Sequence, residues 1–284
     1  MKITKTFIIV FLLTFLIGVI GYFLIPKTDK DIEQKEIVQA IPLHFPQPKI
    51  ETEVQPNIFD IENFWDDTEG KHNTNFLETG EVSNGEDIKA KSGETWFGLF
   101  NENGKDVLRP TKIKVKTTKD ENHIWKEVSV RDKKNPIFLL KDKKKLKIGE
   151  VKTLFREKTL RESDDYNESA TIKSEFNKKF YLGEIEYTLR VEKGISTKQE
   201  PLLVLLLETA TTSQIVHFIY YMDAGDYVGN LYWVGDLDRD GKLDLFMDFY
   251  GYEKGGYSSG LFLSSEAKKG KLVKKSEYFM LGGC

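Results

Sequence analysis

Cysteine, histidine and net charge are all scarce in this 284-residue chain, and each shortage excludes a class of protein. The single cysteine, Cys284, is the last residue, so no intramolecular disulfide can form and the core must hold without covalent cross-links. The four histidines are scattered without an HExxH pairing, so the sequence does not support a zinc site. Lysine and arginine number 42 against 45 acidic residues, so the basic excess that nucleic-acid binding requires is missing.

Proline is also rare, and most of it is confined to one segment. Five of the eight prolines lie in residues 26–57, among charged residues and glutamines. This segment shows no sustained apolar period, so it cannot bury a hydrophobic face as a helix or strand would. We interpret residues 26–57 as an extended linker.

The longest apolar run lies at the N-terminus. Phe7–Ile25 contains nineteen residues without a charge. As a helix it would span roughly 28 Å, which is close to the hydrocarbon thickness of a bilayer. Residues 1–25 are therefore predicted to be an uncleaved signal-anchor that forms a transmembrane helix. A signal peptide cleaved after a small residue such as Gly21 is the alternative.

The remainder of the chain has the pattern of short strands separated by turn residues. Thr95–Phe100 is followed by Asn101-Glu102-Asn103-Gly104, which is a strong hairpin signal. Leu202–Leu207 is apolar on both faces and predicts a central strand, with Ile215–Tyr221 as its hairpin partner. The sequence thus predicts a mainly β fold of antiparallel sheets, arranged as a sandwich or a partial propeller, after the transmembrane helix.

A polar and acidic stretch divides this β portion. Thr159–Glu175 has no apolar period and indicates a loop or a short helix. It would separate an N-terminal β region, residues 58–158, from a C-terminal β region, residues 159–284. Aromatic residues such as Tyr232 and Trp233 in the second region allow a face that binds a sugar or a peptide, although core packing and strand pairing explain most of them.

The most specific motif is the segment Gly235–Asp244, with the sequence GDLDRDGKLD. Its acidic residues recur at positions 1, 3, 5 and 9 of a loop, with Gly241 at position 6, where the chain turns sharply. This spacing directs alternate side chains toward one centre, and an all-oxygen set of ligands suits calcium. The predicted ligands are Asp236, Asp238, Asp240, Asp244 and, through its backbone carbonyl, Lys242.

The motif resembles the calcium loop of FG-GAP/VCBS-type repeats, the strand–loop–strand units of integrin-like propellers. The resemblance covers about residues 234–248, including the Gly235-Asp236 pair and the apolar run Leu245–Met247. Met247 stands at loop position 12, where an EF-hand needs glutamate. Those families carry the loop once per blade, and this chain has one good copy. The resemblance therefore implies a single FG-GAP-like hairpin within another β fold.

These features together predict location and function. The charges beside the apolar run do not fix its orientation, because lysines lie on both sides. Weak calcium sites fill where calcium is roughly millimolar, outside the cytoplasm. We therefore predict a single-pass cell-envelope protein with an extracytoplasmic C-terminal domain; a secreted or periplasmic protein is the alternative. Its predicted role is a membrane-tethered binding or surface-interaction module with one structural calcium and a protein or carbohydrate ligand.

A cell-envelope hydrolase with an accessory structural calcium is the alternative function. Gly256-Tyr257-Ser258-Ser259-Gly260 matches the G-x-S-x-G formula of a nucleophile elbow. That motif requires a strand before it, a helix after it and a downstream histidine, whereas the last histidine, His217, precedes it. The sequence therefore identifies no catalytic residue.

Overall fold

The computed structural model describes residues 56–61, 64, 75–82, 88–119, 124–132, 134–141, 146–158, 170–221, 225–250 and 257–281. All of them belong to one compact unit, Val54–Cys284. The predicted signal-anchor, nearly all of the predicted linker and Cys284 lie outside the described residues. Within the described residues, no helix combines the length and apolar character needed to span a bilayer.

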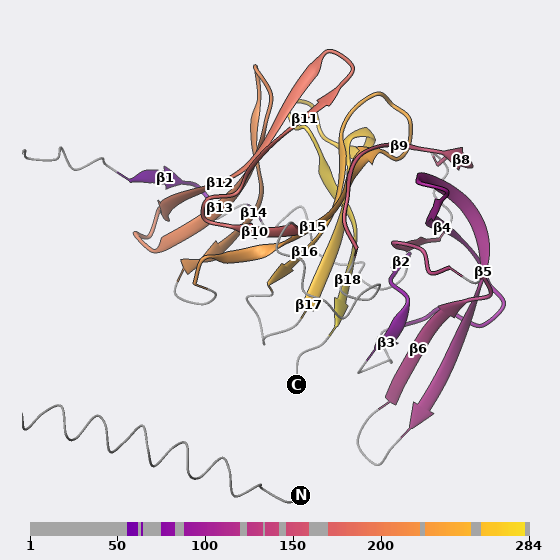
Figure 1. The fold of residues 1–284 in the computed structure, drawn as a ribbon. Helices are drawn as coiled ribbons and strands as arrows, with labels where there is room; N and C mark the ends of the chain where they lie inside the picture. Colours follow the sequence, from indigo (N-terminus) through magenta and orange to yellow (C-terminus); the bar gives the residue numbers. More distant parts are fainter. Residues whose placement is uncertain are drawn as a thin grey trace, which may run out of the picture. The chain divides into compact units, whose positions relative to one another are not determined.

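The described chain is mainly β-structure in three sheets, which confirms the predicted class (Figure 1). The first sheet has seven strands in the order β2-β7-β4-β5-β6-β3, and β8 pairs with β5. Its strands are β2 (Phe76–Leu77), β3 (Gly80–Val82), β4 (Thr95–Glu102), β5 (Lys105–Lys119), β6 (Ile124–Val130), β7 (Leu139–Leu140) and β8 (Gly149–Glu150). β4 and β5 form the predicted hairpin, and its two turn residues, Asn103 and Gly104, have φ angles of 54° and 83°. Positive φ at both positions suits a two-residue hairpin turn.

The second sheet has five strands in the order β1-β12-β13-β14, and β11 pairs with β12. Its strands are β1 (Asn57–Phe59), β11 (Asn177–Leu182), β12 (Ile185–Ser196), β13 (Pro201–Glu208) and β14 (Ser213–Tyr220). β1 pairs with β12 in parallel, whereas the other pairs are antiparallel. The apolar run Leu202–Leu207 lies in β13 between two neighbouring strands and is buried on both faces, which confirms the predicted central strand.

The third sheet has six strands in the order β10-β15-β16-β17-β18, and β9 pairs with β15. Its strands are β9 (Lys152–Arg156), β10 (Thr171–Lys173), β15 (Tyr227–Asp236), β16 (Asp244–Tyr250), β17 (Tyr257–Leu263) and β18 (Lys274–Leu281). The prediction of a loop or helix for Thr159–Glu175 is wrong at its end. Residues 171–173 form β10 because Ile172 is fully buried and pairs with β15.

The six-stranded sheet contributes to two hydrophobic cores. On one side, Trp233 and Phe246 pack with residues of the seven-stranded sheet such as Trp96. On the other side, Val234 and Leu245 pack with residues of the five-stranded sheet. Strands β15 and β16 therefore bury apolar side chains on both faces, which is typical of strands covered on both sides. Tyr232 and Trp233 are buried here, so they serve packing rather than an exposed ligand-binding face.

A buried carboxylate joins the seven-stranded and six-stranded sheets. Asp106 on β5 is 2% exposed. It accepts hydrogen bonds from the Trp233 indole nitrogen at 3.0 Å, the Thr153 hydroxyl at 2.8 Å and the Asn101 amide at 3.0 Å. Arg156 lies 3.6 Å from the same carboxylate. Asp106 thus connects β4, β5, β9 and β15, and this connection places β15 and the aspartate loop that follows it.

Candidate metal centre

The aspartate loop is the connection between β15, which ends at Asp236, and β16, which begins at Asp244. The strands pair up to the base of the loop, where Gly235 lies opposite Asp244. Gly241 has a φ of 81°, and open space surrounds the position that a Cβ would occupy there. Glycine is therefore required at this position for its backbone conformation rather than for lack of room.

Three of the predicted ligands come together. One carboxylate oxygen from each of Asp236, Asp238 and Asp244 lies within 4.8 Å of the other two. Their residues are 8%, 5% and 0% exposed. Three carboxylates this close and this buried repel one another, because little water screens their charges.

The loop backbone holds the first and last of these carboxylates. The two oxygens of Asp236 accept hydrogen bonds from the backbone nitrogens of Asp240 at 3.0 Å and Gly241 at 3.1 Å. One oxygen of Asp244 accepts from the backbone nitrogen of Leu237 at 2.7 Å. A carboxylate offers about four lone-pair sites, so these oxygens retain capacity for a further ligand.

Asp238 differs from its neighbours because both of its oxygens are buried without a hydrogen-bond donor. Burial raises the pKa of Asp238, and the nearby carboxylates of Asp240 and Asp236 act in the same direction. The Ser265 side chain and the Asp240 backbone act in the opposite direction and lower that pKa in part. Burial is the main cause that raises the pKa of Asp244 to about 8, and the neighbouring carboxylate of Asp238 raises it further.

Asp240 and Lys242, the other two predicted ligands, are exposed, and Asp240 lies outside the group of three converging carboxylates. One oxygen of Asp240 accepts from the Lys242 backbone nitrogen at 2.9 Å. The same oxygen lies 3.0 Å from the Ser264 hydroxyl, whose single hydrogen is shared between Asp240 and Asp244. Asp240 and the Lys242 carbonyl therefore remain predicted ligands.

Ser264 is a site residue that sequence reasoning missed. It begins the short 3-10 helix η4 (Ser264–Glu266), which follows β17. Its backbone nitrogen and its hydroxyl donate to the second oxygen of Asp244 at 2.8 Å and 3.0 Å. Twenty residues separate the two in sequence, and no local pattern marks the pairing. Only the packing of the β17–β18 connection against the loop brings them together.

The donor set fits a hard cation such as calcium. Calcium binds oxygens at about 2.3–2.6 Å, so two ligands on opposite sides lie at most about 4.6–5.2 Å apart. The 4.8 Å limit on the three carboxylates meets that requirement. Zinc favours nitrogen and sulfur, and this group contains neither histidine nor cysteine.

No known protein family, curated protein or solved structure matches this chain. The likeness to FG-GAP/VCBS-type repeats remains a prediction carried by residues 234–248.

The G-x-S-x-G segment does not have the surroundings of a nucleophile elbow. Ser258 lies inside β17, between Phe249 of β16 and Met280 of β18. The adjacent Ser259 is fully buried, and its hydroxyl donates to Glu78. A nucleophile elbow places its serine on a sharp turn from a strand into a helix. Ser258 instead lies in the interior of an antiparallel sheet.

A cleft of about 640 Å³ adjoins the metal centre. Lys242 of the aspartate loop and Ser264 both line it, as do Tyr187 at the start of β12 and Thr211 in the β13–β14 turn. The Tyr187 hydroxyl interacts with the backbone of Leu243, inside the aspartate loop. The volume falls within the range of roughly 300–1,000 Å³ that is usual for ligand-binding clefts.

Proposed function

We propose that this chain is a calcium-stabilised β-domain, held on a membrane tether outside the cytoplasm, that serves as a binding or surface-interaction module. Asp236, Asp238 and Asp244 would hold the calcium ion, and Asp240 and the Lys242 carbonyl would complete its oxygen ligands. The ion would neutralise the repulsion among these carboxylates. It would thereby fix the β15–β16 connection.

The observation that carries this proposal is the state of Asp238. Its carboxylate is 5% exposed, accepts no hydrogen bond and lies within 4.8 Å of two other carboxylates. A buried charge without a partner is costly, and natural structures satisfy such groups with a counter-charge or a metal ion. A cation at this point supplies what Asp238 lacks.

The cleft beside the loop supports the binding role. The aspartate loop and η4 both contribute to its lining. An ion that rigidifies the loop would also fix that part of the cleft. A structural ion beside a ligand site improves binding because the site loses less conformational freedom when it is filled.

Calorimetric titration of the purified full-length chain with calcium chloride tests the metal site. The wild type should bind one calcium ion per chain, and Asp244→Asn should abolish or greatly weaken that binding. Asp226→Asn is the matched control, because Asp226 is an exposed aspartate outside the cluster. Absence of calcium binding in the wild type, or equal losses in both variants, would refute the site.

Labelling of the single cysteine tests the predicted location. A membrane-impermeant maleimide should modify Cys284 in intact cells as fully as in permeabilised cells. Labelling that occurs only after permeabilisation would place the C-terminal domain in the cytoplasm and contradict the proposal.

A further inference from the structure

The five-stranded sheet buries apolar side chains on both of its faces. Alternate residues of β13, such as Leu203 and Leu205, pack in the core that this sheet shares with the six-stranded sheet. The residues between them point to the opposite, outer face, because successive side chains of a strand alternate. The buried residues of the outer face are Leu202, Val204 and Leu206 of β13 and Phe218 of β14. The outer face is therefore covered, although the six-stranded sheet lies on the other side.

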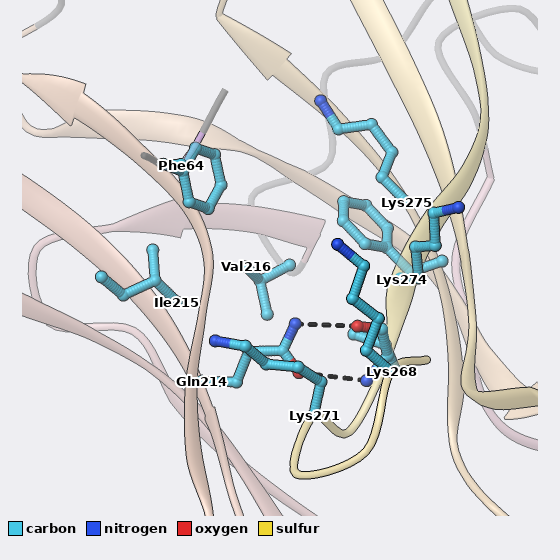
Figure 2. A pocket seen from close by; sticks show the side chains of 10 residues that line it. Phe64, Gln214, Ile215, Val216, Lys268, Lys271, Lys274 and Lys275 are labelled. Atoms are coloured by element: carbon cyan, nitrogen blue, oxygen red, sulfur yellow. Dashed lines mark hydrogen bonds between the residues drawn. The ribbon is translucent and has the colours of Figure 1, made fainter. Parts of the chain in front are cut away.

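The described residues of segment 57–64, the arm, cover this outer face. Ile61 is 5% exposed and belongs to the same cluster, and Phe59 and Phe64 pack against it. The rings of Phe64 and Phe218 meet edge to face, with 5.2 Å between their centres. Figure 2 shows Phe64 next to β14. Three apolar side chains of one short segment thus shield the outer face from water.

The arm begins with β1, which also covers part of a sheet edge. β12 has β13 on one side, and on its other side β11 pairs with residues 185–190 and β1 pairs with residues 194–196. β2, the next strand along the chain, belongs to the seven-stranded sheet instead (Figure 1). Without β1, residues 194–196 would present unpaired backbone groups, which are a template for pairing with another chain.

Gly194 of β12 makes room for β1. A Cβ at this position would lie 2.5 Å from the backbone oxygen of Asn57 and 2.5 Å from the ring of Phe59, and its three nearest atoms all belong to β1. Glycine inside a strand often marks a place where another backbone approaches closely. The Asn57 side chain donates to Glu192, which lies on the same face of β12 as Gly194. This part of β12 is therefore shaped to accept an extended segment that carries an aromatic ring.

Few contacts hold the arm in place. β1 has only three residues, and Ile58 at its centre is 64% exposed. A cleft of about 350 Å³ lies beside Ile61, and one of about 120 Å³ lies beside Phe64. A closely packed interior leaves few spaces of this size, so the arm packs less tightly than the core does. The arm can therefore leave its place more readily than an interior strand can.

The chain after the arm is long enough to reach a second copy. Eleven residues, 65–75, connect Phe64 to β2. Fully extended, they can span up to roughly 36–40 Å. Before the arm lies the predicted linker, which ends where β1 begins. The two segments that flank the arm thus do not tie it directly to the sheet that it covers.

We propose that two copies of this chain exchange their arms, so that β1 of each copy pairs with β12 of the other. Phe59 and Ile61 of one copy then cover the outer face of its partner. The contacts equal those within one chain, because the second copy brings an identical segment, and exchange of an identical element is a low-cost route to a dimer. The inference does not depend on the calcium-stabilised module, and a shared membrane would only raise the local concentration of the copies.

Disulfide cross-linking of two co-expressed full-length chains tests the exchange. Both chains carry Cys284→Ser, which removes the only native thiol. One chain carries Ile58→Cys and an affinity tag, and the other carries Ile195→Cys. Because Ile58 and Ile195 are partners in the β1–β12 register, a thiol oxidant should join the two chains. In the matched control, Ile185→Cys replaces Ile195→Cys, since Ile185 lies roughly 33 Å away along the same strand.

The mixed disulfide should form at least about ten times more with Ile195→Cys than with Ile185→Cys. A single chain that carries both Ile58→Cys and Ile195→Cys shows whether this pair can be oxidised. If that chain forms the disulfide but the co-expressed chains give no more mixed dimer than the control, the arm stays in its own chain and the proposal is overturned. If that chain forms no disulfide, β1 does not pair with β12, and the proposal is equally overturned.

Blocking the acceptor distinguishes exchange from association through another surface. Gly194→Val in the Ile195→Cys chain should reduce the mixed dimer to the level of the control, because the added side chain takes the space of Phe59. Lys193→Val adds a valine on the opposite face of the same strand and should leave the yield within about twofold. Equal yields in the two variants would contradict exchange through β12. If Gly194→Val does not fold, the comparison with Ile185→Cys still decides the proposal.

Discussion

Neutralising Asp238 at constant size should change the stability of the domain in opposite directions with and without calcium. Asp238→Asn replaces a carboxylate that is 5% exposed and accepts no hydrogen bond. An unsatisfied buried polar group costs about 1–3 kcal/mol, and more when it is charged. The new amide can also donate to the adjacent carboxylates. In the presence of a chelator, the variant should therefore be more stable than the wild type by about 1–3 kcal/mol.

Calcium should reverse this order. A ligand at 1,000 times its dissociation constant stabilises the state that binds it by about 4.1 kcal/mol, which exceeds the difference of about 1–3 kcal/mol in chelator. For a domain of this size, 1 kcal/mol corresponds to roughly 2–4 °C, so the Tm of the wild type should rise by roughly 8–16 °C. Asp238→Asn offers one fewer anionic ligand and should gain much less.

Thermal unfolding in chelator and in calcium chloride measures both effects, with Asp226→Asn as the control for removal of one exposed aspartate. The control should respond to calcium as the wild type does. A variant at Asp238 that is less stable than the wild type in chelator would show that the buried carboxylate is satisfied in some other way. A variant that gains as much from calcium as the wild type would show that Asp238 is not a ligand.

Three other predictions concern buried residues of the sheets and of the segment that packs on the aspartate loop. Asp106→Ala should lower the free energy of unfolding by about 3 kcal/mol, since it leaves buried donors of Trp233 and Thr153 unpaired; an unchanged urea midpoint would contradict the joining role of Asp106. His217 is 5% exposed and its two nitrogens have no partner. Because its pKa falls from 6.5 to about 3 on folding, the unfolded state takes up the proton first and stability is lost as pH drops below 6.5. Between pH 6.5 and 5 the wild type should lose about 2 kcal/mol relative to His217→Leu, and parallel stability curves from pH-dependent urea unfolding would refute this. Ser264→Ala removes the hydroxyl hydrogen that Asp240 and Asp244 share and should cost about 1 kcal/mol in chelator, measured by urea unfolding. No loss is expected from Ser258→Ala, which is the control.

Sequence patterns predicted those elements whose conformation depends on residues close by in the sequence. The hairpin of β4 and β5 followed from Asn103-Gly104, because few residues adopt positive φ at both positions of a two-residue turn. The central strand β13 followed from its apolar run, because only a strand covered on both sides lacks polar residues. By contrast, β10 was missed because its three residues owe their conformation to pairing with β15 rather than to any periodicity of their own.

The aspartate loop also combines features that the sequence predicts with features that only the tertiary structure decides. Residue spacing alone placed Asp236, Asp238 and Asp244 around one centre, because a short loop between paired strands constrains where its alternate side chains lie. Tertiary structure decided that Asp238 is buried without a donor, that Asp240 lies outside the cluster, and that Ser264 holds Asp244. Burial and contacts across twenty residues depend on how the β17–β18 connection packs on the loop. That packing depends on the summed contacts of the sheets, and no single segment of the sequence specifies it.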